Sequence, residues 1–225
     1  MRSRRVLAAV IGFLLLVLGP AAPSFSATAT ADQCSTEDFN GDPRLGPREL
    51  PTRGSVGLEL ATYDRFAGLT PAQFLATYWD DTANGGRGGW RYPQANGFMI
   101  GPDGNPIHFV LPLRAGQRVD RYGSEFGAFL APTGAQYAQR AIPPQSLDNA
   151  SAPGGCNYVS YRVGREFDVD GGPIAPAFGQ PGLGLQYMLV GTLVAGAPER
   201  LNVRWLIDNG FLVRCVVVIS RPFAC

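Results

Sequence analysis

Lysine is absent from this 225-residue chain, and histidine occurs once, at His108; all 19 basic side chains are arginines. A Ser-His-Asp or Cys-His catalytic set would have to use that histidine. His108 lies in an apolar stretch, so we expect it to be packed in the core. No CxxC motif occurs, and the sequence therefore indicates no metal site. The glycine run at residues 85–89 lacks the lysine that a Walker phosphate loop needs.

Long hydrophobic runs are also scarce. The apolar run at residues 6–18 is too short to cross a bilayer. It follows three arginines and precedes small residues, which is typical of a secretory signal peptide over residues 1–31. Without that segment, 16 arginines stand against 18 acidic side chains, a net charge of −2. This balance argues against nucleic-acid binding. We expect a secreted, extracellular protein without a membrane span.

The four cysteines all follow the expected signal peptide. An even number in an exported chain favours two disulfides, for which three pairings are possible. The pairing that we favour joins Cys34 to Cys156 and Cys215 to Cys225. It would connect the N-terminal segment to the rest of the chain and fix the C-terminal tail.

Hydrophobic patterning divides the remaining chain near residue 105. Residues 32–104 form a small helical and loop segment. Residues 105–225 form the second part, rich in strands with alternating polar and apolar side chains, and we expect this part to be the catalytic domain. Glycine and proline together exceed one residue in five, so long helices should be few. The fold class is therefore α+β, with a twisted antiparallel β core, a few short helices and a small helical N-terminal segment. Expected strands are 107–113, 118–122, 128–131, 158–163, 167–169, 185–194 and 211–219.

Helix signals are local. Residues 56–66 favour a first helix. Thr70 is a good N-cap, with Pro71 in the first turn of a second helix that carries an apolar stripe through Trp79. A third helix is expected from Ala197 to residue 207 and should end at Asn209-Gly210.

Three rigid segments between residues 119 and 181 each place a planar polar side chain beside glycine or proline: Arg121, Arg140 and Gln180. Stiff backbone of this kind allows a ligand to approach closely. With Tyr122 and Phe129, these residues suit a phosphorylated ligand that carries a flat ring, because arginine binds pyrophosphate through two parallel hydrogen bonds. Structural turns with solvated arginines would give the same pattern.

The motifs Asp120-Arg121-Tyr122-Gly123, Gln139-Arg140-Ala141-Ile142-Pro143-Pro144 and Phe178-Gly179-Gln180-Pro181 occur in this order. Here the chain resembles the tuberculosis necrotizing toxin (TNT) family of NAD glycohydrolases, and it is most similar to the secreted branch typified by fungal surface enzymes. The resemblance extends over most of the chain after residue 31. It implies hydrolysis of NAD to ADP-ribose and nicotinamide without a cofactor or a metal.

The resemblance also implies roles for single residues. Arg121 and Gln180 would be catalytic, with Arg121 on the pyrophosphate and Gln180 at the ribose. Tyr122 and Phe129 would flank the nicotinamide, and Arg140 would support the phosphates. The chain departs from the family in three places. Tyr122 replaces a phenylalanine, Ala177 replaces a tryptophan whose loss would open the pocket wall, and no histidine lies between the second and third motifs.

Other readings of the same residues remain open. A transferase or cyclase could use the same pocket, and a non-catalytic module could bind NAD or ADP-ribose without consuming it. The expected partner is NAD as a small-molecule substrate. A homodimer and an inhibitor protein are further possibilities that the resemblance raises.

Overall fold

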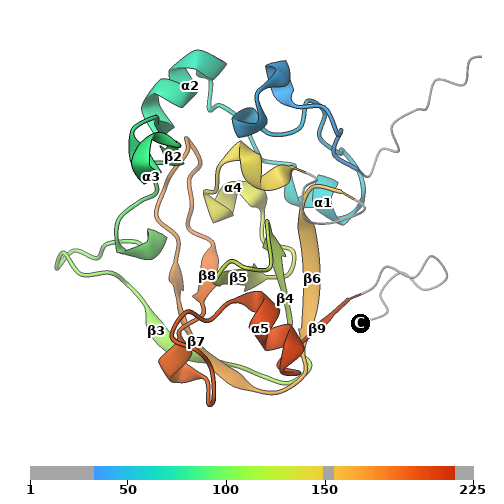
Figure 1. Cartoon of the computed structure of the whole chain (residues 1–225), viewed down its shortest axis with the longest axis vertical. Helices are drawn as coiled ribbons and strands as arrows, with labels where there is room; N and C mark the ends of the chain where they lie inside the picture. The colour runs from blue at the N-terminus through green and yellow to red at the C-terminus, as the bar shows by residue number, and fades with distance from the viewer. Residues whose placement is uncertain (1–32, 149–154, 216–225) are drawn as a thin grey trace, which may run out of the picture.

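The structure, a computed structural model, describes residues 33–148 and 155–215. Seven strands form one antiparallel sheet in the order β3-β7-β8-β5-β4-β6-β9. The sheet curls, with short helices at its two ends (Figure 1). The expected α+β class with an antiparallel core is confirmed. The strands are β3 (Phe109–Leu113), β4 (Arg118–Tyr122), β5 (Phe129–Pro132), β6 (Tyr158–Val163), β7 (Phe167–Pro173), β8 (Leu185–Met188) and β9 (Leu212–Arg214).

The main core lies between the curled sheet and the last helix, α5 (Val203–Asp208). Val119, Val163 and Val169 from three strands and Leu206 from α5 are fully buried there. Alternate side chains of β6 face this core, at Val159, Tyr161 and Val163, as the period of two in its sequence predicts.

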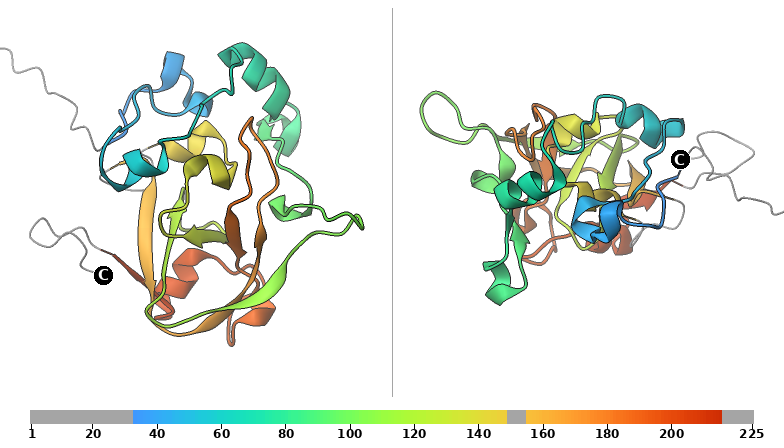
Figure 2. Two further views of the ribbon diagram at one scale, coloured as in Figure 1. Left: turned by 180° about the vertical axis from the view of Figure 1, so that it is seen from behind. Right: turned by 90° about the horizontal axis from the view of Figure 1, so that it is seen from above.

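The N-terminal segment carries short helices that lie at the end of the sheet opposite α5 (Figures 1 and 2). Thr70 is the N-cap of α2 and Pro71 lies in its first turn, as predicted, and Gln73 completes a capping box with Thr70. The helices and helical turns are α1 (Gly54–Glu59), α2 (Pro71–Tyr78), α3 (Ala83–Gly86), α4 (Tyr137–Arg140), η1 (Phe39–Gly41), η2 (Pro43–Leu45), η3 (Ala95–Gly97), η4 (Pro144–Leu147) and η5 (Gly191–Leu193).

Several element boundaries were predicted wrongly. Helix α1 ends at Glu59, and α5 begins at Val203, where the Asn202 side chain accepts a hydrogen bond from the Trp205 backbone. Strand β8 ends at Met188 and is followed by the turn η5. Trp79 leaves α2 and pairs with Trp90 in a two-stranded sheet of β1 (Trp79–Asp80) and β2 (Gly89–Trp90), which the sequence did not indicate.

The N-terminal segment is tied to the sheet at several points. A disulfide joins Cys34 to Cys156, as predicted. The backbone amide of Ala175 donates to the Gly97 carbonyl at 2.8 Å. Cys215 is disulfide-bonded, but its expected pairing with Cys225, like the expected signal peptide, lies outside the described residues. No helix in the described part of the chain is long and apolar enough to cross a membrane.

Candidate active site

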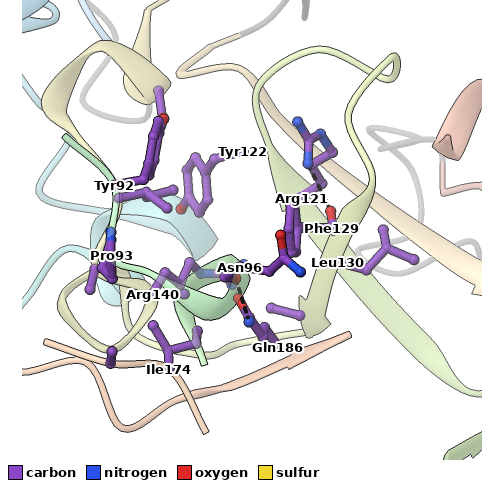
Figure 3. A pocket seen from close by; sticks show the side chains of 16 residues that line it. Tyr92, Pro93, Asn96, Arg121, Tyr122, Phe129, Leu130, Arg140, Ile174 and Gln186 are labelled. Atoms are coloured by element: carbon purple, nitrogen blue, oxygen red, sulfur yellow. Dashed lines mark hydrogen bonds between the residues drawn. The ribbon is translucent and has the colours of Figure 1, made fainter. Parts of the chain in front are cut away.

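A pocket of about 430 Å³ lies where β4, β5 and β8 meet α4 and the N-terminal segment. Its volume falls in the range of small-molecule sites. The structure brings four of the five predicted site residues to this pocket and leaves Gln180 out of its lining. The four are Arg121, Tyr122, Phe129 and Arg140, and the N-terminal segment adds Tyr92, Pro93, Asn96 and Gly97 (Figure 3).

Arg121 on β4 is held by backbone carbonyl groups alone. Its Nε donates to the Ser124 carbonyl at 2.7 Å, and one terminal nitrogen donates to the Phe129 carbonyl at 2.8 Å. It forms no ion pair with any carboxylate in the described part of the chain, and burial lowers its pKa from the ordinary value. A partly buried arginine without a counter-charge favours an anionic ligand.

The loop between β4 and β5 leaves room for this arginine because it carries glycine at two places. Gly123 has a φ of 96°, a backbone conformation that favours glycine. A Cβ atom at Gly127 would collide with the Arg121 guanidinium. Gly123 and Gly127 therefore allow the loop between β4 and β5 to pass close to Arg121.

Arg140 on α4 is buried in an ion-pair cluster. Its terminal nitrogens donate to Asp120 at 2.6 and 3.0 Å and to Glu59 Oε2 at 3.0 Å. Two further donations go to the Ala135 carbonyl, at 3.0 and 3.1 Å. Two carboxyl groups therefore accept hydrogen bonds from Arg140, whereas Arg121 has no such partner among the described residues.

The cluster holds two carboxylates close together in a dry environment. Burial, followed by the charge of Asp120, raises the pKa of Glu59 to about 7. Burial also raises the pKa of Asp120, but the Arg140 guanidinium, the Tyr158 hydroxyl and the Gly134 amide all donate to that carboxylate and oppose the shift.

Aromatic side chains line the pocket on two sides (Figure 3). Tyr122 is buried, lies 5.0 Å from the Arg140 guanidinium and donates its hydroxyl hydrogen to Glu59 at 3.0 Å. Phe129 is 36% exposed and Tyr92 is 59% exposed. Tyr122 is thus fixed inside the wall, and the two exposed rings are the ones free to stack on a ligand.

Gln180 is buried in a turn away from the pocket. Its amide nitrogen donates to the Asp64 carbonyl at 2.5 Å and to the Phe178 carbonyl at 3.4 Å. These bonds connect the third motif to the N-terminal segment. Ala177 in the same motif does not line the pocket either, and the effect of the missing tryptophan on the pocket wall stays a prediction.

A different glutamine, Gln186 on β8, lines the pocket. Its amide nitrogen donates to the Asn96 carbonyl at 3.0 Å, the dashed line in Figure 3. No hydrogen bond to its Oε1 atom occurs within residues 33–148 and 155–215. Gln186 was not among the predicted site residues, although a polar residue between Leu185 and Tyr187 in an apolar strand is a usable signal.

His108 is not a core residue, contrary to the prediction. Its side chain is 40% exposed, lies beside the edge strand β3 and pairs with Asp170 at 2.6 Å, while its ring stacks on Phe98. In the part of the chain that the structure describes, no group of three or more histidine, cysteine or acidic side chains could hold a metal ion.

Comparison with known proteins gives three findings. The model of the family described as "Tuberculosis necrotizing toxin" (TNT) matches residues 112–215. The conidial surface nicotinamide adenine dinucleotide glycohydrolase nadA of Aspergillus fumigatus is 41% identical over 196 residues, which cover 84% of this chain and 79% of that protein. The solved structure of the toxin with its immunity factor has a TM-score of 0.42 and 20% identity, and the match covers 79% of each chain.

Proposed function

This chain belongs to the tuberculosis necrotizing toxin family, and we propose that it is an NAD glycohydrolase, which hydrolyses the bond between ribose and nicotinamide. The similarity to the Aspergillus enzyme extends over most of the chain. The observation that carries the proposal is Arg121, a partly buried guanidinium without a counter-charge among the described residues, in a pocket with two exposed aromatic rings. The pyrophosphate and the flat nicotinamide ring of NAD match these two features.

In the proposed mechanism, Arg121 binds the pyrophosphate through its free N–H groups. Phe129 and Tyr92 flank the nicotinamide from opposite sides of the pocket (Figure 3). Nicotinamide leaves as a neutral molecule because its ring is cationic in NAD, so the bond can break without a general acid. The electron pair of the broken bond goes to the nicotinamide nitrogen, water adds to the ribose carbon, and one proton is released to solvent.

We propose Gln186 in place of Gln180 as the amide that acts at the ribose. Its hydrogen bond to Asn96 fixes the side chain, and this leaves Oε1 to accept a hydrogen from a ribose hydroxyl or from the attacking water. An oriented acceptor at this place favours the oxocarbenium-like transition state, which carries positive charge. Gln180 keeps a structural role in this proposal.

Arg140 contributes less to phosphate binding than Arg121 does, because its N–H groups are already bound to Asp120 and Glu59. Its proposed role is to hold the pocket wall through Tyr122, whose ring lies next to its guanidinium. The same wall includes residues on both sides of the boundary near residue 105. We therefore propose that residues 105–225 do not form a catalytic domain by themselves.

The proposed enzyme acts outside the cell. The described disulfide between Cys34 and Cys156 fits an oxidising compartment. The Aspergillus relative is named as a surface protein. The homodimer and the inhibitor protein stay predictions.

The test is incubation of the purified, disulfide-bonded protein with NAD, with nicotinamide and ADP-ribose both quantified. Equal release of the two products is expected. Release of nicotinamide with a cyclic product, or with ADP-ribose joined to an added acceptor protein, would instead identify a cyclase or a transferase. Intact NAD together with a thermal shift would identify a binding module.

A further inference from the structure

Glu59 belongs to α1 of the N-terminal segment, outside the part of the chain that the family model matches. It is 3% exposed. Its Oε2 atom accepts a hydrogen bond from Tyr122 and another from Arg140, both at 3.0 Å. One carboxyl oxygen thus touches two side chains that line the pocket.

Every charged or titratable group that faces Glu59 is on the sheet or on α4: Asp120 and Tyr122 of β4, Arg140 of α4 and Tyr158 of β6. One terminal nitrogen of Arg140 donates to both carboxylates. Two ionised carboxylates on one guanidinium would give this buried group a net charge of −1. With one proton shared between them, the net charge is zero.

The hydrogen bonds decide which carboxylate holds the proton. Asp120 accepts two bonds from Arg140, one from Tyr158 and one from the Gly134 amide. Four donors stabilise its ionised form. Glu59 accepts fewer, and its raised pKa agrees with the neutral form near neutral pH.

We propose that Glu59 is a positioning residue: its neutral carboxyl group, supplied by α1, fixes Arg140 and Tyr122 in the pocket wall and keeps that wall free of net negative charge. This inference rests on the proposed function, because NAD brings a negatively charged pyrophosphate to the same pocket. With Glu59 neutral, Arg121 is the uncompensated charge that the substrate meets. With Glu59 ionised, the group formed by Arg140, Asp120 and Glu59 carries a net charge of −1, and this charge offsets the positive charge of Arg121.

The sign of the pH effect follows from this balance. As the pH rises through about 7, Glu59 loses its proton and the pocket loses one unit of positive charge. The KM for NAD is expected to rise about tenfold between about pH 6 and about pH 8.5, because a nearby like charge disfavours an anion. Turnover at saturation is expected to change less.

The experiment compares the wild type with Glu59→Gln, Glu59→Ala and the control Glu166→Gln, a change in an exposed ion pair with Arg114. Glutamine has the shape of the neutral carboxyl group, so Glu59→Gln should keep turnover near pH 6 and show a flat KM at higher pH. Glu59→Ala should lose turnover both near pH 6 and at higher pH. Glu166→Gln should keep the pH dependence of the wild type.

A flat KM in the wild type would overturn the proposal, as would a folded Glu59→Gln variant that is inactive at every pH. Binding of ADP-ribose, whose two phosphate charges do not change in this range, gives a second readout by calorimetry. Its affinity should fall with pH in the wild type and stay constant in Glu59→Gln. If the wild type binds ADP-ribose in this pH-dependent way but leaves NAD intact, the proposed function fails and the inference about Glu59 stands. If neither the KM for NAD nor the affinity for ADP-ribose changed with pH in the wild type, the inference about Glu59 would be rejected.

Discussion

The α-carbon of Gly127 faces the guanidinium of Arg121, and the space between them is too small for a methyl group. The two residues lie on either side of the same loop, whose carbonyl groups at Ser124 and Phe129 accept hydrogen bonds from the arginine. Arg121 is therefore held by the shape of the loop as well as by hydrogen bonds.

Gly127→Ala should lower kcat/KM for NAD by about tenfold or more, because the added methyl group displaces the guanidinium, and displaced groups of this kind cost such factors. Gly116→Ala is the control, since a Cβ atom at Gly116 meets nothing. Its positive φ of 88° should cost about 1 kcal/mol of stability and leave activity intact. Steady-state kinetics and thermal melting check both variants. Equal activity in the two would show that the position of Arg121 does not matter.

Arg121→Ala should lower kcat/KM by about a hundredfold or more, since truncating a buried charged contact costs about 2–5 kcal/mol. Arg121→Lys should recover only part of this loss, because lysine keeps the charge but cannot reach both carbonyl groups and the ligand at once. If the lysine variant matched the wild type in kcat/KM, the planar guanidinium of Arg121 would not be needed beyond its charge. Kinetics with NAD provide the measurement.

Two glutamines should respond in opposite ways to the same change. Gln186→Ala is expected to reduce kcat by about a hundredfold with a smaller effect on the melting temperature, because Gln186 lines the pocket and is the amide proposed to act at the ribose. Gln180→Ala removes a buried donor from the Asp64 and Phe178 carbonyls and should cost about 1–3 kcal/mol of stability. The reverse pattern, with a stable and inactive Gln180 variant, would restore the assignment made from sequence.

Stability should depend on pH through Glu59. Its pKa is raised from 4.5 to about 7 in the folded state. The stabilisation is complete below about pH 4.5 and is lost progressively up to about pH 7, where the folded state also ionises. Relative to Glu59→Gln, the wild type should lose on the order of 1–3 kcal/mol across this window. Chemical denaturation at several pH values measures the difference. If the free energy of unfolding changed with pH in the same way in both proteins, Glu59 would not be the source of the pH dependence.

Replacing Cys34 and Cys156 by serine should destabilise the protein by about 2–5 kcal/mol, because this disulfide joins residues 122 positions apart and restricts the unfolded chain. The melting temperature of the double variant checks this value. Its activity at low temperature should persist, since neither cysteine lines the pocket. A loss of activity in the folded variant would show that the disulfide also shapes the site.

Part of the sheet could be predicted because alternating side chains mark a strand such as β6, and the N-cap of α2, Thr70 followed by Pro71, has a local signature. Arg121, Tyr122 and Phe129 were found because they lie in or beside one short motif. Gln186 was missed in favour of Gln180, because only the pairing of β8 with β5 and β7 brings it to the pocket. Likewise, no local pattern reveals that Glu59 touches Arg140, which lies 81 positions away.

The pocket wall is assembled from both parts of the chain. The Asn96 carbonyl fixes Gln186, and the Glu59 side chain fixes Arg140, so the N-terminal segment supports two functional side chains of residues 105–225. The two parts of the chain therefore have to match where their side chains meet, at Glu59 and Arg140. Chimeras that exchange residues 105–225 alone between relatives should fail unless the partner residue at 59 moves with them, and substitutions at positions 59 and 140 should be correlated among relatives.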